Sequence, residues 1–193
     1  MTDPNYHHPL IERILSDDKQ AYNELYERTI PDIYKTTRFL IEDKADVDDL
    51  VQEIYIQLFK SLKKYDTNRP FKSWYMGIVM KQIQSYRRKR WMHVRIIKKA
   101  EALKQTAVLD FSNEVVDKLT NQELVELVTQ LPYKLQQVII LRYLNDFSQD
   151  EVARILEIPL GTVKSRINAA LNKLRANEKG KKLLENARNV YEY

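Results

Sequence analysis

The sequence predicts an all-α protein made of two small helical domains. Apolar residues recur at the helical period of about 3.6 along most of the chain, and period-two alternation is scarce. The 193 residues include only three glycines, far apart. No apolar stripe is sustained between residues 93 and 113, so we place a linker there. We therefore expect a first domain at 1–92, the linker at 93–113, a second domain at 114–177 and a tail at 178–193.

The clearest helix of the first domain is expected near residues 47–62. Its apolar positions form one face: Val47, Leu50, Val51, Ile54, Tyr55, Leu58, Phe59 and Leu62. Asp43 or Asp46 can cap its start. Upstream, apolar positions between residues 21 and 41 predict one or two helices, with Pro31 marking a kink or break. Downstream, residues 65–70 read as a loop before a helix from Phe71 to about Arg90, whose inner face holds Phe71, Trp74, Tyr75, Ile78, Val79 and Ile83.

The second domain contains a helix-turn-helix pattern. It begins with a helix near 114–130, and Pro132 starts another that runs to about Leu144. Ser148 and Glu151 have the spacing of a capping box. After a turn at residues 157–159, the helix from Leu160 would lie in a DNA major groove, with polar and basic side chains near its N-terminus. The alternative is a plain helical hairpin with a basic rim.

Charge is segregated along the chain, although the total is only +5. Residues 63–104 carry thirteen basic side chains against two acidic ones, and residues 154–193 carry nine against four. These blocks are either solvated faces or two separate contacts with polyanions. In the helix after residue 70, aromatic residues interleave with the cations, which favours single-stranded nucleic acid. Trp74 is either core or platform, whereas Tyr86 and Trp91 are the better stacking candidates. The loop at 65–71 is the natural place for a pocket that takes a flipped base.

Asp46, Asp49 and Glu53 share one helix face. They are either a divalent-metal site or a surface that docks a partner protein; no histidine or nucleophile lies near them in the sequence.

Composition excludes several classes of function. With three scattered glycines the chain has no glycine-rich phosphate loop, and with no cysteine it has no disulfide, thiolate zinc site or cysteine nucleophile. No apolar run is long enough to span a membrane, so we expect a soluble protein of the cytoplasm. We predict no cofactor, no bound metal and no catalytic residue.

The motifs together resemble a bacterial sigma factor of the extracytoplasmic-function (ECF) group in the sigma-70 family. The resemblance runs from about residue 18 to 176, in order and at matching spacing. It rests on segments 46–60, 70–75, 131–143, 148–153 and 161–166. It implies two helical domains, region 2 and region 4, joined by a linker. It also implies a non-catalytic subunit that directs promoter-specific initiation by minus-35 recognition and minus-10 melting.

The resemblance assigns residues to three surfaces. Asp49, Gln52 and Glu53 match the motif that grips the β′ clamp helices of core RNA polymerase. The minus-10 surface corresponds to Tyr65, Asn68, Arg69, Phe71, Lys72, Trp74, Lys81, Tyr86, Arg87 and Arg88. The minus-35 surface corresponds to Gly161, Thr162, Lys164, Ser165, Arg166 and Asn168. Gly77 and Lys81 depart from the Arg and Asn usual in the family, and 169–171 replaces a usual R-A-R.

The implied partners are core RNA polymerase, through its β′ clamp helices and β flap, promoter DNA, and an anti-sigma factor. No direct insertion into a membrane is expected. Two other functions remain open. A stand-alone helix-turn-helix regulator would account for residues 148–175, and a metal-dependent nuclease would use Asp46, Asp49 and Glu53.

Overall fold

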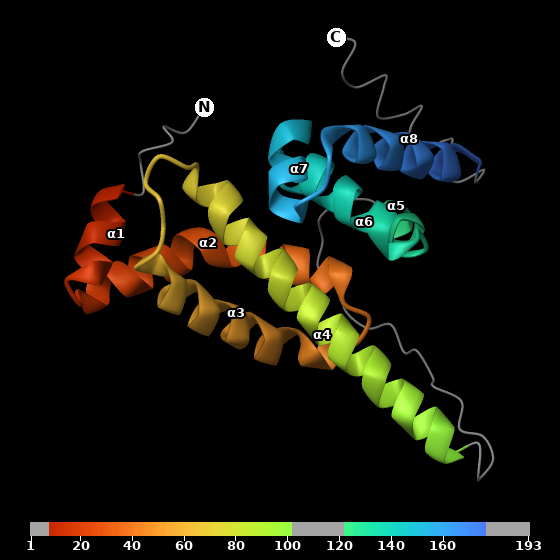
Figure 1. Ribbon diagram of the computed structural model, residues 1–193, viewed down its shortest axis with the longest axis horizontal. Helices are drawn as coiled ribbons and strands as arrows, with labels where there is room; N and C mark the ends of the chain where they lie inside the picture. Colours follow the sequence, from red (N-terminus) through yellow and green to blue (C-terminus); the bar gives the residue numbers. More distant parts are fainter. Residues whose placement is uncertain (1–7, 102–121, 177–193) are drawn as a thin grey trace.

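The computed structural model describes residues 8–101 and 122–176, and every regular element in these two ranges is helical. The N-terminal domain contains α1 (His8–Leu15), α2 (Lys19–Leu40), the short 3-10 helix η1 (Lys44–Asp46), α3 (Val47–Leu62) and α4 (Phe71–Glu101). The C-terminal domain contains α5 (Gln122–Thr129), α6 (Tyr133–Ile139), the π-helix η2 (Ile140–Leu144), α7 (Gln149–Leu156) and α8 (Leu160–Ala176) (Figure 1). The all-α prediction is confirmed. The tail at 178–193 and residues 102–121, including the expected helix start near 114, lie outside the described ranges.

Helices α2, α3 and α4 pack around one apolar core. Leu25 and Ile33 from α2, Ile54 from α3, and Val79 and Ile83 from α4 are all completely buried. Burying one such side chain stabilises the fold by roughly 1.5 to 3 kcal/mol, so the three helices hold one another in place. None of the described helices is long and apolar enough to cross a lipid bilayer.

The helix boundaries differ from the prediction at three places. Pro31 lies inside a continuous α2, because buried residues on both sides of it pack that helix against the core. Asp43 caps η1 through the backbone N–H of Ala45, whereas Asp46 makes no side-chain cap. Helix α4 continues past Arg90 to Glu101, so the first part of segment 93–113 is helical. That stretch contains neither proline nor glycine, which leaves nothing to stop the helix locally.

The helix-turn-helix forms as predicted. Pro132 occupies the N-cap of α6, and Ser148 and Glu151 complete a capping box at the start of α7. The turn to α8 passes through Glu157, whose backbone is left-handed with φ of 54°. Val152 and Ile155 of α7 are buried with Val163 and Ile167 of α8, which fixes the angle between the two helices.

Asp146 supplies a first testable prediction. Its φ of 60° is left-handed, and its side chain is exposed. Asp adopts this backbone more readily than Ala does, because its short polar side chain can hydrogen-bond to the local backbone, and Gly adopts it freely. We expect Asp146→Ala to lower the free energy of unfolding by about 1 kcal/mol and Asp146→Gly to leave it equal or higher. Urea denaturation of the two variants checks this, and a less stable Gly variant would contradict it.

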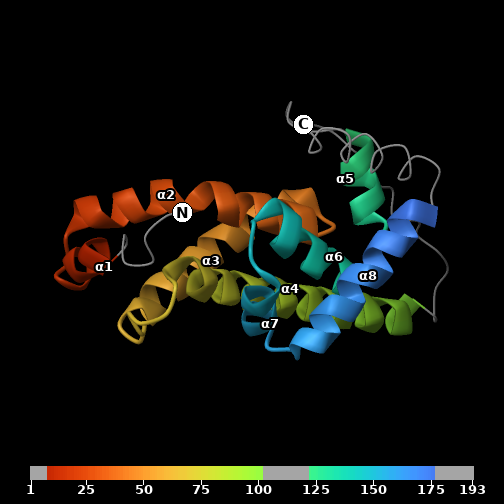
Figure 2. The ribbon, with the colours of Figure 1, turned by 90° about the horizontal axis from the view of Figure 1, so that it is seen from above.

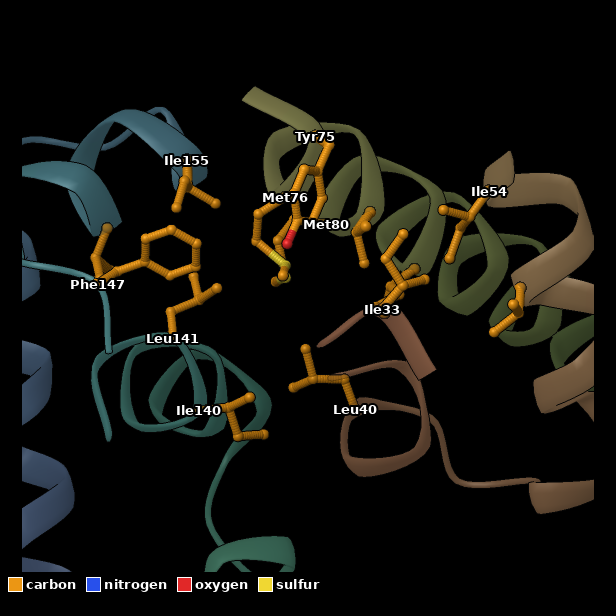
Figure 3. Close-up of a cluster of buried hydrophobic side chains, with 14 of the residues drawn as sticks. Ile33, Leu40, Ile54, Tyr75, Met76, Met80, Ile140, Leu141, Phe147 and Ile155 are labelled. Atoms are coloured by element: carbon orange, nitrogen blue, oxygen red, sulfur yellow. The ribbon is translucent and has the colours of Figure 1, made fainter. Parts of the chain in front are cut away.

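The two domains are packed against each other. Helix α7 packs on α4, and α6 and η2 contact α2. Two views at right angles show α7 beside α4 (Figures 1 and 2). Figure 3 shows side chains of the two domains in one continuous apolar cluster, with Leu40 of α2 facing Ile140 of η2. The described residues therefore form a single packed body.

Candidate nucleic-acid and polymerase interfaces

The acidic face of α3 points away from the apolar core. Asp49, Gln52 and Glu53 are all exposed, because Leu50, Val51 and Ile54 take the buried side of the same turns. Gln57 donates to Glu53 over 3.1 Å, and Ile56 on the same side is 46 % exposed. This face therefore offers carboxylate, amide and one apolar group together. Sequence reasoning missed Ile56, although it falls outside the apolar stripe at 47–62.

Asp46 does not join that face. It accepts hydrogen bonds from Tyr86 and, over 3.2 Å, from Arg90, which also donates to Asp43 over 3.0 Å. The hydrogen bond from Arg90 holds the pKa of Asp43 below its usual value. Among the described residues, no group of three His, Cys, Asp or Glu side chains is placed to hold a metal ion. The cluster instead braces α4 against the start of α3.

At the 65–71 loop, where a base pocket is expected, aromatic rings pack beneath exposed polar residues. The Tyr65 ring lies 4.8 Å from that of Trp74 and 5.3 Å from that of Phe71, measured between centroids. Its hydroxyl donates to the carbonyl of Arg69, and burial raises its pKa. Asn68 and Arg69 are exposed and bond to Asp66. Phe71 is only 1 % exposed, so it supports the loop from below instead of lying on its surface.

Most of the predicted minus-10 cations on α4 already have partners. Lys72 pairs with Asp32 over 3.0 Å, Arg87 with Glu42 over 3.1 Å, and Lys81 with Glu157 over 2.7 Å. Arg88 is exposed. The six side chains of these pairs are between 27 and 67 % exposed, so each pair adds little to stability.

Tyr86 and Trp91 are placed differently. The Tyr86 ring is half-buried against the core, and burial, reinforced by the hydrogen bond to Asp46, raises its pKa to about 12. Trp91 is 60 % exposed, with the Arg95 guanidinium 5.2 Å from its ring centroid. Of these two predicted stacking residues, Trp91 is the more exposed.

Four of the six minus-35 candidates lie on one exposed side of α8, and Thr162 and Arg166 flank it. Gly161, Lys164, Ser165 and Asn168 are exposed, opposite the buried Val163 and Ile167. Thr162 is half-buried, and its carbonyl accepts from the Ser165 hydroxyl over 3.0 Å. Arg166 lies toward α4 and lines a cavity of about 220 Å³ together with Lys81 and Glu157. The first two turns of α8 thus present a polar, cationic face suited to DNA.

The capping carboxylate Glu151 supplies a pH prediction. It accepts from the Ser148 N–H over 2.8 Å and from the Ser73 hydroxyl of α4 over 3.0 Å. Burial alone would raise its pKa, but the hydrogen bonds from Ser148 and Ser73 outweigh burial and lower it. A carboxyl whose pKa is lowered by folding contributes stability above its unfolded value, and loses it as the pH falls through the folded value.

We therefore expect acid to lower the free energy of unfolding of the unmodified chain more than that of the Glu151→Gln variant. The glutamine amide can still accept a hydrogen bond but is not protonated in this pH range. Urea midpoints measured near pH 6 and near pH 3.5 give the comparison, with the variant showing the smaller fall. Equal falls in the two proteins would show that Glu151 does not contribute to the acid sensitivity.

Comparison with known proteins places both domains in one family. Residues 25–92 match the family model for Sigma-70 region 2, and residues 121–174 match that for Sigma-70, region 4. The chain is 25 % identical over 175 residues to the ECF RNA polymerase sigma factor SigW of Bacillus subtilis, covering 86 % of this chain and 92 % of that protein. It is 29 % identical over 170 residues to the ECF RNA polymerase sigma-E factor of Escherichia coli, covering 82 % and 86 %.

Solved structures share the fold. CnrH in complex with the cytosolic domain of CnrY superposes with a TM-score of 0.62 at 22 % identity, over 95 % of this chain and 98 % of that one. The sigma factor RpoE in complex with the anti-sigma factor NepR, from Bartonella quintana, gives a TM-score of 0.67 at 20 % identity, over 80 % and 94 %.

Proposed function

Because this chain belongs to the sigma-70 family, as a sigma factor of the ECF group, we propose that three surfaces share its work in promoter-specific transcription initiation. The α3 face with Asp49, Gln52 and Glu53 binds the β′ clamp helices of core RNA polymerase. The loop after α3 and the following helix α4 bind minus-10 DNA. The first turns of α8 bind the minus-35 element, and the C-terminal domain also contacts the β flap.

The charges of the three surfaces support this division of roles. The exposed face of α3 is acidic and partly apolar, whereas the loop before α4, helix α4 itself and the start of α8 are cationic. A protein that bound only DNA would have no use for the α3 face, and that face would repel phosphates. We infer that the chain acts by binding alone, without catalysis, and that it works in the cytoplasm, where core polymerase is.

Regulation by an anti-sigma factor is part of the proposal. Two of the solved structures with this fold are described as complexes, one of them of a sigma factor with an anti-sigma factor. We infer that an anti-sigma factor also holds this chain inactive.

The test is to separate polymerase binding from DNA binding. Gln52→Ala with Glu53→Ala should reduce capture of core polymerase and transcription in vitro, and spare contacts with duplex DNA. A matched control is Glu126→Ala with Gln130→Ala, which removes the same two residue types from exposed positions in the C-terminal domain. We expect this control to behave as the unmodified chain.

Two results would contradict the proposal. If the variant with Gln52→Ala and Glu53→Ala captures core polymerase as well as the unmodified chain does, α3 is not the polymerase-binding surface. A DNA footprint made without polymerase would favour the stand-alone helix-turn-helix regulator, which explains the start of α8 but leaves the α3 face idle.

A further inference from the structure

We propose that the cavity lined by Lys81, Lys134 and Arg166 binds a small phosphate monoester, of about the size of a pentose phosphate. Its volume is about 220 Å³, and residues of α4, α6, α7 and α8 form its wall. The function proposed above assigns no small molecule to this chain, so the site goes beyond it. The charge of the wall, a buried hydroxyl in it and its size support this ligand.

The charges on the cavity wall favour an anion. The three cations are opposed there by one carboxylate, that of Glu157, which pairs with Lys81 over 2.7 Å. Within the described parts of the chain, no acidic side chain forms an ion pair with Lys134 or Arg166. Like charges around one cavity repel each other unless an anion lies between them. A phosphate is suited to this place, because a guanidinium can bind two of its oxygens and an ammonium a third.

The same wall contains a buried hydroxyl whose hydrogen bonding is unsatisfied. Tyr133 lines the cavity, and among the described residues its hydroxyl has no hydrogen-bond partner of normal geometry. Burial raises the pKa of this phenol to about 12, although Arg87 and the side chain of Gln137 lie close enough to oppose the rise. The hydroxyl therefore keeps its proton at neutral pH. A buried donor without a partner costs free energy, and a ligand oxygen against Tyr133 supplies the acceptor.

The remaining wall and the size of the cavity favour a phosphate that is attached to a small polar body. Gln84 and Gln137 bring amides that both donate and accept, as the hydroxyl groups of a sugar require. Met80 and Ile155, two members of the apolar cluster in Figure 3, give the cavity an apolar side for the carbon skeleton. Pockets for drug-sized molecules measure roughly 300 to 1,000 Å³. This smaller cavity therefore suits a ligand below that size, such as a pentose phosphate.

A bound phosphate ester would compete with DNA. Lys81 belongs to the proposed minus-10 surface and Arg166 to the proposed minus-35 surface, and both line the cavity. An ester that holds these two side chains keeps them from DNA phosphates and bases, so its concentration would control the affinity for DNA. This consequence rests on the proposed function, whereas binding of the ester does not.

Isothermal titration calorimetry of the full chain with ribose 5-phosphate, without polymerase or DNA, tests the site. Ribose and inorganic phosphate are titrated at the same salt concentration. We expect the ester to bind more tightly than inorganic phosphate by about tenfold or more, because only the ester meets the cations and the amides together. Ribose should show no binding. No binding of the ester, or equal affinity for the ester and inorganic phosphate, would overturn the site.

Two variants place the ester in the cavity. Arg166→Gln and Lys134→Gln should each weaken its binding by on the order of tenfold, since each removes a charge-assisted hydrogen bond. The controls are Arg175→Gln and Lys89→Gln, which remove the same residue types at exposed positions outside the cavity wall. We expect the controls to keep the affinity of the unmodified chain. Equal losses in the controls would show that the ester binds to diffuse surface charge, and would overturn the site.

A third variant should gain affinity, which a misfolded protein would not do. Glu157→Gln removes the carboxylate of the cavity wall and frees Lys81, so the ester should bind several-fold more tightly. Glu126→Gln is the matched control, because it changes the net charge by the same amount at an exposed position outside the wall. The control should leave the affinity unchanged. Equal tightening in the two variants, or none in Glu157→Gln, would overturn the site.

A DNA measurement distinguishes the ester site from the proposed function. Fluorescence anisotropy with a labelled single-stranded oligothymidylate should show that ribose 5-phosphate displaces the DNA from the chain. Ester binding without displacement would support the small-ligand site and contradict the assignment of Lys81 and Arg166 to DNA. If Lys134→Gln weakens binding of the oligothymidylate as much as binding of the ester, the cavity holds phosphates of the DNA backbone, and the small-ligand site is overturned.

Discussion

Replacing Phe147 with alanine is expected to lower the free energy of unfolding by about 3 to 5 kcal/mol. The ring is 2 % exposed and lies between Leu141 and Ile155, with the Lys72 ammonium 5.4 Å from its centroid (Figure 3). Truncation leaves a cavity at the junction of η2, α7 and α4, where helices fixed by capping and by the interface cannot collapse fully. Urea denaturation followed by circular dichroism measures the loss.

The control for Phe147→Ala is Tyr143→Ala. Tyr143 is an aromatic residue of the same segment but is 55 % exposed, so its removal should change the free energy by no more than about 0.5 kcal/mol. Similar losses for both variants, or a loss below 1 kcal/mol for Phe147→Ala, would show that this junction is not a packed core.

Lys164→Ala and Arg166→Ala are each expected to weaken minus-35 binding, by about 1 to 3 kcal/mol for a side chain that reads a base. Both lie in the first two turns of α8, where an inserted helix meets base edges. The measurement is transcription with core enzyme over a promoter library randomised at the minus-35 element, at one salt concentration.

The way in which the loss of transcription depends on the minus-35 sequence identifies the kind of DNA contact that the side chain makes. Loss confined to certain minus-35 sequences indicates a base contact, whereas uniform loss indicates a phosphate contact. Lys173→Ala, exposed near the other end of α8, is the control and should keep both activity and preference. If the Gln52 and Glu53 variant shows the same sequence-dependent defect, the division of roles between α3 and α8 is wrong.

The sequence predicts those helices and turns that are determined by residues close together in the chain. Helix α3 follows from its apolar stripe, α7 from the capping box of Ser148 and Glu151, and the turn before α8 from Pro159. The exposure of Asp49, Gln52 and Glu53 follows from the same stripe, since they fall on its opposite side. The assignment of these residues to polymerase, and of the cationic residues to DNA, stays a prediction.

Long-range packing was not predictable in the same way. Met76 and Met80 lie one step off the main stripe of α4, and only a second domain against that helix accounts for their burial. Nothing near Asn145 in the sequence indicates Thr36, which is 109 positions away. Tyr86 looks exposed among its charged neighbours, yet the fold brings Asp46 to its hydroxyl.

The π-helix at Ile140–Leu144 has a consequence for comparing this chain with its relatives. The backbone N–H of Asn145 reaches the carbonyl of Ile140, five residues back, so this turn holds one residue more than an α-helical turn. Removing one residue here would restore the ordinary spacing and rotate everything upstream by about 100° relative to Asn145. A homologue shortened by a single position in this stretch would therefore keep its helix-turn-helix while losing the orientation that joins its two halves.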